Sequence, residues 1–263
     1  MIQLTPDEYA RIVPLIRRSE IRSHLALAHA VVEGNQNGKI FVDSQARPFT
    51  ALVCPASGFY FVFGHVNLPL FSRFLPELRR EHLVPKCALL ATSVAWRDAL
   101  APLLPATASR MGFTFEPDGA AATGSVQGAL LSRYTMEPMT AVLCERWPGG
   151  LDPWVIYVYG GPSGFAARSF GVCLLCEGHV VSFVAACGIG GGEAEVEVGT
   201  VPEYRRRGLA TVGCRAFIRE TLAKGLRPGW SCASDNPPSA ALGRTLGFVE
   251  EEKVHLYPLD GAA

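Results

Sequence analysis

The chain carries little charge, and the two signs balance. Charged side chains make up 18% of its 263 residues, with 24 lysines and arginines against 24 aspartates and glutamates. A neutral chain does not attract nucleic acid by bulk electrostatics, so we expect no nucleic-acid partner. Apolar residues make up 49%, and this length allows one large domain or two small ones with a buried core.

Long apolar segments are also missing. No run approaches the roughly 18 consecutive apolar residues of a membrane-spanning helix, so we expect no membrane association. The first residues include Asp7 and Glu8 and no apolar stretch typical of a signal peptide. These absences predict a cytoplasmic protein.

The eight cysteines do not form a complete set of metal ligands. Cys173 and Cys176 form a Cys-x-x-Cys pair inside an apolar segment that reads as a strand, where residues three apart point to opposite faces. Tetrahedral zinc needs four ligands, and no second pair stands at the required spacing. We therefore interpret the cysteines as reduced core residues and expect no metal site.

The segment that indicates most about function is residues 200–210, which read Thr-Val-Pro-Glu-Tyr-Arg-Arg-Arg-Gly-Leu-Ala. An alternating strand pattern precedes this segment, and an amphipathic helix pattern follows it. A helix that begins at Gly208 leaves its first backbone N–H groups without helical partners, and glycine lets a ligand approach the backbone closely. The arginines and the helix dipole favour an anion, so the turn is a candidate pyrophosphate site. Taken alone, the motif favours a charged helix start that binds nothing.

A second motif follows about thirty residues later. The predicted helix over residues 208–224 ends at Gly225, a strand is predicted over residues 230–233, and a short helix follows Asp235. This succession resembles the C-terminal half of the GNAT N-acetyltransferase superfamily. The residues that match the family's two motifs are Arg205, Gly208 and Ala210 in the first, and Asn236, Ser239, Leu242, Gly247 and Phe248 in the second.

More narrowly, the chain resembles a bacterial GNAT subgroup in which a degenerate N-terminal half precedes an active C-terminal domain. The resemblance implies an α/β fold with a mixed sheet and two GNAT-like halves in tandem, over residues 1–125 and 126–263. It also implies an enzyme that transfers acetyl from acetyl-CoA to an amine by direct attack on the thioester. The acceptor would be a small molecule or a peptide, and a homodimer is one possible assembly.

The first half repeats the element order of the second in outline. A helix is predicted over residues 6–33. Three strands, a helix, a strand and a helix are then predicted at 39–43, 49–54, 59–65, 70–82, 87–91 and 96–104. No Arg-x-x-Gly-x-Gly/Ala motif follows the third strand, so we expect no cofactor site in this half. The turn-rich residues 117–125 are the candidate linker.

By the same resemblance, the fourth strand of the second half splays from the fifth, and its free backbone groups pair with the pantetheine arm. The arginine-rich turn would hold the pyrophosphate, and the next strand–helix junction would also contact the cofactor. The cofactor-binding residues implied are Val198, Thr200, Arg205, Arg206, Arg207, Gly208, Leu209, Ala210, Thr211, Asn236 and Ser239.

The candidate catalytic residues are Glu195 and Glu197, which share one strand face because they are two residues apart. Many family members place a general base, or a carboxylate that holds a water, on this strand; a solvated strand face is the alternative. Gly243 stands where many relatives have a tyrosine acid. Tyr204 or Tyr257 could replace that acid, or the thiolate could leave unassisted, since a thiol pKa is about 8.5.

Residues 149–169 are rich in glycine, proline and aromatic residues, and they either shape the acceptor pocket or pack as a loop. We assign no chemical role to His24, His29 or His179. The missing tyrosine is also consistent with a non-enzymatic acyl-CoA-binding or interaction module. Transfer of a longer acyl group is a further alternative.

Overall fold

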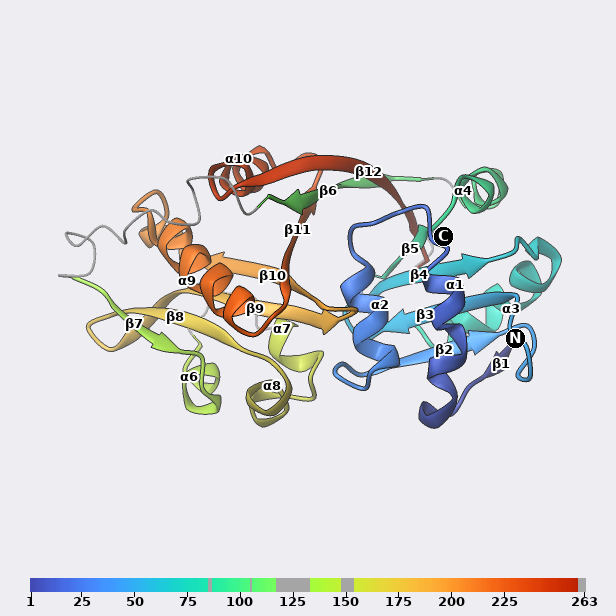
Figure 1. The fold of residues 1–263 in the computed structure, drawn as a ribbon, viewed down its shortest axis with the longest axis horizontal. Helices are drawn as coiled ribbons and strands as arrows, with labels where there is room; N and C mark the ends of the chain where they lie inside the picture. The colour runs from blue at the N-terminus through green and yellow to red at the C-terminus, as the bar shows by residue number, and fades with distance from the viewer. Residues whose placement is uncertain (85–86, 105, 117–132, 148–153, 260–263) are drawn as a thin grey trace.

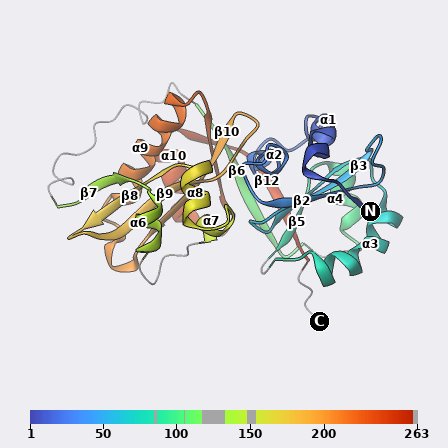
Figure 2. The ribbon, with the colours of Figure 1, turned by 90° about the horizontal axis from the view of Figure 1, so that it is seen from below.

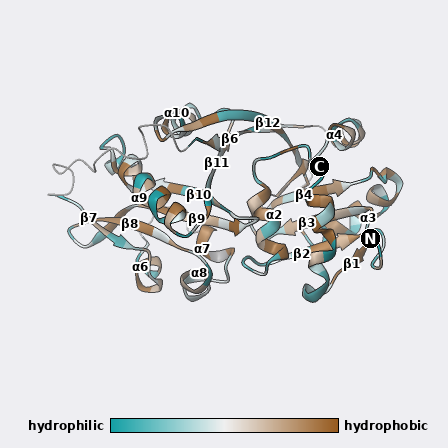
Figure 3. Cartoon of the chain, in the orientation of Figure 1, coloured by the Kyte–Doolittle hydropathy of each residue, from teal (hydrophilic) through white to brown (hydrophobic). Residues whose placement is uncertain are grey.

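The computed structural model describes residues 1–84, 87–104, 106–116, 133–147 and 154–259. The strands of this part of the chain form one mixed sheet in the order β1-β2-β3-β4-β5-β12-β6-β11-β10-β9-β8-β7 (Figure 1). Hydrophobic residues are frequent along the strands in both halves of the molecule (Figure 3). The sheet therefore supplies much of the apolar surface that the helices cover.

The first half begins with short elements and continues with longer strands and helices. Its elements are β1 (Ile2–Gln3), η1 (Pro6–Ile12), α1 (Val13–Ile16), α2 (Leu25–Val32), β2 (Gly38–Val42), β3 (Thr50–Pro55), β4 (Phe59–Gly64), α3 (Leu68–Glu81), β5 (Ala88–Ala91), α4 (Val94–Leu100) and β6 (Ala108–Phe115). The strands and helices predicted after α2 are all present with small shifts of their ends.

The predicted helix over residues 6–33 is wrong as a single element, because the chain leaves the helical path between α1 and α2. Backbone N–H groups in this break bond to distant acceptors. The amide of Glu20 donates to the carbonyl of Thr92 at 2.9 Å, and that of Ser23 donates to Glu252 Oε1 at 2.6 Å. His24 then adopts a φ of +67° before α2 starts. Tertiary hydrogen bonds thus override a local helical pattern.

The second half contains the elements expected around the two motifs. They are β7 (Thr135–Pro138), α6 (Ala141–Glu145), α7 (Trp154–Tyr157), α8 (Pro162–Arg168), β8 (Gly171–Cys176), β9 (His179–Gly190), β10 (Glu193–Thr200), η2 (Pro202–Tyr204), α9 (Leu209–Ala223), β11 (Arg227–Ala233), α10 (Pro237–Thr245) and β12 (Phe248–Pro258). The predicted strand–turn–helix–strand–helix succession is confirmed.

Both halves share one topology. In the first half, β2, β3 and β4 form an antiparallel meander, and α3 then leads to β5, which lies parallel to β4. In the second half, β8, β9 and β10 form the meander, and α9 leads to β11, which lies parallel to β10. A parallel neighbour requires such a crossover, and here a helix supplies it twice. The repeat confirms the expected tandem mixed-sheet fold.

The two halves exchange strands where they meet (Figure 2). Strand β6 of the first half lies between β11 and β12 of the second, and β12 in turn lies between β6 and β5. Residues 248–256 of β12 pair with β6, and residues 256–258 pair with β5. Each half thus completes the sheet of the other. The predicted linker at 117–125 lies outside the described residues, and the boundary between residues 125 and 126 stays a prediction.

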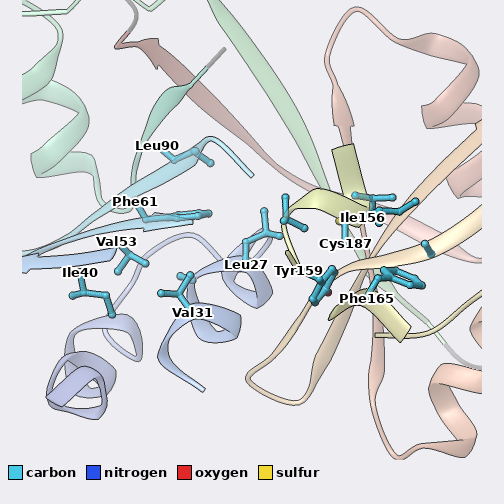
Figure 4. Close-up of a cluster of buried hydrophobic side chains, with 14 of the residues drawn as sticks. Leu27, Val31, Ile40, Val53, Phe61, Leu90, Ile156, Tyr159, Phe165 and Cys187 are labelled. Carbon is cyan, nitrogen blue, oxygen red and sulfur yellow. The ribbon is translucent and has the colours of Figure 1, made fainter. Parts of the chain in front are cut away.

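One hydrophobic cluster crosses from half to half (Figure 4). Leu27 and Val31 of α2 and Phe61 of β4 belong to the same buried cluster as Tyr159 and Phe165 near β9. Close approach of α2 to β9 depends on glycine, because a side chain at Gly190 would meet the α2 backbone at 2.4 Å. Helix α2 therefore packs onto the sheet of the second half as well as its own.

All eight cysteines are buried and none forms a disulfide, as expected for core cysteines. In the part of the chain that the structure describes, no helix is both long and apolar enough to cross a membrane.

Candidate functional site

Strands β10 and β11 separate midway along β10. Their parallel pairing runs only from Glu193 to Glu195, whereas β10 pairs with β9 along its whole length. A bulge in β9, with Cys187 as its extra residue, faces the point where the strands part. The described part of the chain therefore contains a V-shaped opening between β10 and β11, as the family resemblance implied.

The backbone of Val198 and Thr200 faces this opening. The amide of Val201 donates to the carbonyl of Val181 in the neighbouring meander at 2.9 Å. Because hydrogen-bonding direction alternates along an antiparallel strand, Gly199 also faces β9, and the residues on either side of Gly199 face away from it. These are the two backbone positions that the family resemblance implied for a pantetheine arm.

The arginine-rich turn leads from the end of β10 into α9. Gly208 adopts a φ of +82° as the N-cap residue and offers no side chain to cap the helix. The first hydrogen bond of α9 runs from the Val212 amide to the Gly208 carbonyl at 3.1 Å. The amides of Leu209, Ala210 and Thr211 therefore have no helical acceptor, and an anion could satisfy them.

The three arginines of the turn differ in their contacts. Arg205 donates from Nε to the Thr200 carbonyl at 3.1 Å, and Arg207 donates from Nη2 to the Glu203 carbonyl at 2.8 Å. The Arg207 guanidinium also lies 5.0 Å from the centre of the Tyr204 ring. Arg206 is exposed, and its side chain has no partner among the described residues. Two arginines thus shape the turn, and Arg206 keeps its charge available.

At the next strand–helix junction, Asn236 caps α10. Its Oδ1 accepts a hydrogen bond from the Ser239 amide at 3.2 Å. Both residues lie where the second motif predicted them, on the junction after β11. The amide oxygen of Asn236 therefore caps the helix, whether or not the side chain also contacts a ligand.

At Gly243, where many relatives have a tyrosine, the space for a side chain is occupied by Trp230. A Cβ at Gly243 would lie 2.9 Å from the indole Nε1 of Trp230, so a larger residue does not fit there. Tyr257, one suggested replacement, is buried in the core of the first half and donates to the Arg97 carbonyl at 3.4 Å. Tyr204 remains beside the turn, with its ring next to that of Tyr134.

Glu195 lies at the base of the V and is buried, with 4% of its surface exposed. Ser231 Oγ donates to Glu195 Oε1 at 2.6 Å. Burial raises the pKa of Glu195 to about 7, while the Ser231 hydrogen bond and the charge of Arg110 act in the opposite direction. Glu197 follows on the same strand face and is half-buried. The alternative of a solvated strand face therefore does not hold for Glu195.

A cavity of about 560 Å³ reaches Glu195 from the junction of the two halves. Its walls come from residues 16–25 of the first half, the β9–β10 hairpin, the start of β11 and the end of β6. Two ion pairs border it, Arg227 with Glu193 at 2.5 Å and Arg22 with Glu251 at 3.2 Å. Its volume is in the range of small-molecule sites.

Two residues near this cavity received no role from the sequence. His24 is buried, and its Nε2 lies 3.2 Å from Nε of Arg110. Arg110 also donates from Nη2 to Ser231 Oγ at 3.0 Å. The partners lie 86 and 121 residues apart in sequence, so no local pattern signals these contacts.

The aromatic segment after residue 149 is described from residue 154 onward. Tyr159 is fully buried and donates to the Ala186 carbonyl at 3.1 Å, and its ring packs against Phe165. This arrangement favours packing over acceptor recognition for Tyr159. The side chains of Trp154 and Tyr157 lie outside the described residues.

Comparisons with known proteins agree with this architecture. A family model described as GNAT acetyltransferase matches residues 20–257. The uncharacterised N-acetyltransferase YdfB of Bacillus subtilis (strain 168) is 26% identical over 235 residues, which cover 87% of this chain and 88% of that protein.

Two solved structures share the fold. A GCN5-related N-acetyltransferase-like protein from Streptococcus suis aligns with a TM-score of 0.69 at 20% identity, over 96% of this chain and 98% of the other. A tandem GNAT protein from the clavulanic acid biosynthesis pathway aligns with a TM-score of 0.62 at 11% identity, over 100% and 99% of the two chains. Because the family model spans most of its length, this chain belongs to the GNAT acetyltransferase family and is an N-acetyltransferase.

Proposed function

We propose that this N-acetyltransferase uses acetyl-CoA and acetylates an amine that binds in the cavity beside Glu195. The observation that carries the proposal is the opening between β10 and β11, with an uncapped helix N-terminus at one end and a buried carboxyl at its base. The anionic and amide-rich parts of acetyl-CoA fit this arrangement. Its thioester supplies the activated acetyl group.

Backbone groups and one arginine carry most of the cofactor contacts in this proposal. Val198 and Thr200 pair with the pantetheine amides as a neighbouring strand would. The pyrophosphate lies against the N–H groups of residues 208–211, where the helix dipole and Arg206 favour negative charge. Arg205 and Arg207 hold the turn in place. Asn236 and Ser239 contact the cofactor from the α10 side.

Glu195 accepts the proton of the acceptor's ammonium group, directly or through a water, with Glu197 beside it on the same strand face. A base works best when its pKa lies near the working pH, and burial brings the pKa of Glu195 to about 7. The freed amine then attacks the thioester carbonyl. Because a thiol pKa is about 8.5, the CoA thiolate can leave without a tyrosine at position 243.

The cofactor site is tested by calorimetry of acetyl-CoA with Gly208→Glu. We expect one acetyl-CoA per chain in the unmodified protein and no measurable binding in the variant, because the new carboxylate crowds and repels the phosphates. Gly225→Glu is the matched control, since Gly225 also has a positive φ, at the other end of α9, and has open space around it. Unchanged affinity in Gly208→Glu contradicts the proposed cofactor site.

The base is tested by thiol release from acetyl-CoA with a panel of amines. Glu195→Gln should lower kcat by about 10²- to 10⁴-fold and leave acetyl-CoA affinity unchanged. Glu197→Gln, measured in parallel, shows whether the second carboxylate shares the role. If both variants keep near-full activity on a working acceptor, neither glutamate is the base.

A further inference from the structure

A continuous hydrogen-bonded path joins the two halves at Glu195. Ser231 Oγ lies 2.6 Å from Glu195 Oε1, Arg110 Nη2 lies 3.0 Å from Ser231 Oγ, and Arg110 Nε lies 3.2 Å from His24 Nε2. Ser23 Oγ then lies 2.7 Å from His24 Nδ1 and 2.6 Å from an oxygen of Glu252. Arg110, His24 and Ser23 belong to the first half, and the carboxyl groups at both ends belong to the second.

The chemistry of each group allows only one direction along this path. Arginine has donors and no acceptor, so Arg110 donates both to Ser231 and to His24. His24 therefore accepts at Nε2 and is neutral, and burial together with Arg110 lowers its pKa to about 3. Its Nδ1–H then donates to Ser23, whose hydroxyl donates to Glu252. On the other side, the Ser231 hydroxyl donates to Glu195. Each hydrogen bond on this path therefore has one defined donor and one defined acceptor.

Arg110 is the cation that acts on Glu195. It is held in position on three sides, by Ser231, by His24 and by the Phe59 ring, whose centre lies 4.8 Å from its guanidinium carbon. The negative charge of Glu193, on the same strand, acts against the ionisation of Glu195. Glu195 and Glu197 also lie close enough to Cys187, on the neighbouring strand β9, for their charges to raise the pKa of its buried thiol.

We propose that Arg110 is a positioning residue that, through Ser231, orients the Glu195 carboxylate and favours its deprotonated form. The first half of the chain thereby takes part in proton acceptance by the second. This inference rests on the proposed role of Glu195 as the base. The competing possibility is that Arg110 only helps to hold the halves together, which would affect stability but leave the titration of Glu195 unchanged.

The test follows the Glu195 carboxyl directly in the full chain, without acceptor or acetyl-CoA. Protein with ¹³C-labelled glutamate carboxyl carbons is titrated by NMR, and the Glu195 signal is assigned by its loss in Glu195→Gln. In Arg110→Gln the titration midpoint should rise by about one pH unit, because the cation is gone while a hydrogen-bond donor remains. Arg110→Lys keeps the charge and should restore most of the original midpoint.

Ser109→Ala is the matched control. Ser109 lies one residue from Arg110, and its Oγ donates to Oγ of Ser234, just after the end of β11, at 2.9 Å. It should leave the midpoint unchanged. A Glu195 midpoint in Arg110→Gln equal to that of the unmodified protein would overturn the proposal.

Ser231→Ala keeps the experiment decisive if Arg110→Gln does not fold. This variant removes a single hydroxyl, and loss of the bridge should again raise the midpoint; an unchanged midpoint would overturn the proposal. In thiol-release assays with one active amine, the acidic limb of kcat/KM should move to higher pH and the alkaline plateau should be kept. The titration does not depend on turnover, so the two proposals can fail separately. If the Glu195 midpoint shifts but the acidic limb of kcat/KM does not, Arg110 has the positioning role and Glu195 is not the base.

Discussion

His24 and Glu195 are buried titratable side chains whose pKa values move in opposite directions. Burial, with a smaller contribution from Arg110, lowers the pKa of His24 to about 3 from 6.5, so its contribution to stability is lost as pH falls towards 3. Burial raises the pKa of Glu195 to about 7 from 4.5, so its contribution is present below pH 4.5 and is lost as pH rises through 7. The two effects oppose each other between pH 4.5 and 6.5.

Glu195→Gln should reveal this balance. The free energy of unfolding of the variant, relative to the unmodified protein, should rise by roughly 1.4 kcal/mol per pH unit between pH 4.5 and 7, because the ionisation of buried Glu195 no longer opposes folding. Urea unfolding at a series of pH values measures the difference. Glu203→Gln, at an exposed glutamate, is the control for removing one negative charge. A flat difference for Glu195→Gln would mean that Glu195 titrates in the folded protein as it does in the unfolded chain.

At the scale of single elements, the helix starts differ in how they are capped. Helix α10 has a side-chain cap from Asn236, and α3 has the same contact from Asn67 Oδ1 to the Leu70 amide at 3.2 Å. Helix α9 has only Gly208 at this position. A 15-residue helix without a side-chain cap leaves its N-terminal amides available to an anion, whereas a capped helix uses one of them internally.

Replacements of Asn236 should separate its capping role from a cofactor contact. Asn236→Ala should lower the free energy of unfolding by about 1 kcal/mol, whereas Asn236→Asp should keep the cap and the stability. If the side chain also contacts acetyl-CoA, Asn236→Asp should still weaken binding severalfold, because the added charge faces the phosphates. Calorimetry and thermal unfolding measure the two effects.

Asn67→Ala is the control for this experiment, since it removes an equivalent cap from the first half. It should lower stability without changing acetyl-CoA affinity. Unaltered affinity in Asn236→Asp would limit Asn236 to capping α10.

At the scale of the whole molecule, the halves are joined by exchanged strands as well as by the chain between them. Strand β6 of the first half pairs with both β11 and β12 of the second half, so the second half alone would lack the strand between them. Phe113 of β6 is buried in the core of the second half with Trp230. Tyr257 of β12 is buried in the core of the first half. Each core therefore includes side chains from the other half.

Residues 126–263 expressed alone should aggregate or fold poorly, because an open strand edge and the apolar surface beneath β6 would be exposed. Co-expression with residues 1–125 should restore a soluble complex that binds acetyl-CoA. Size-exclusion chromatography and calorimetry on both preparations provide the measurement. A soluble and fully active 126–263 fragment would show that the halves are independent.

Features that depend on neighbouring residues could be predicted from the sequence. Apolar periodicity located most strands and helices, and the spacing of Arg205, Gly208 and Ala210 located the turn into α9, because a strand–turn–helix junction is built from consecutive residues. The order of the two motifs also predicted the family and the splayed strand. The sequence showed that Gly243 replaces the tyrosine, but it did not show that the indole of Trp230 lies against this position.

Contacts between side chains from distant segments could not be predicted in this way. The break after α1, the burial of Glu195 and the insertion of β6 between β11 and β12 all depend on contacts between distant segments. Ser231 lies 36 residues from Glu195 and 121 from Arg110 in sequence, yet the sheet brings all three within hydrogen-bonding reach. A pKa depends on burial and on nearby charges, and both are properties of the folded sheet.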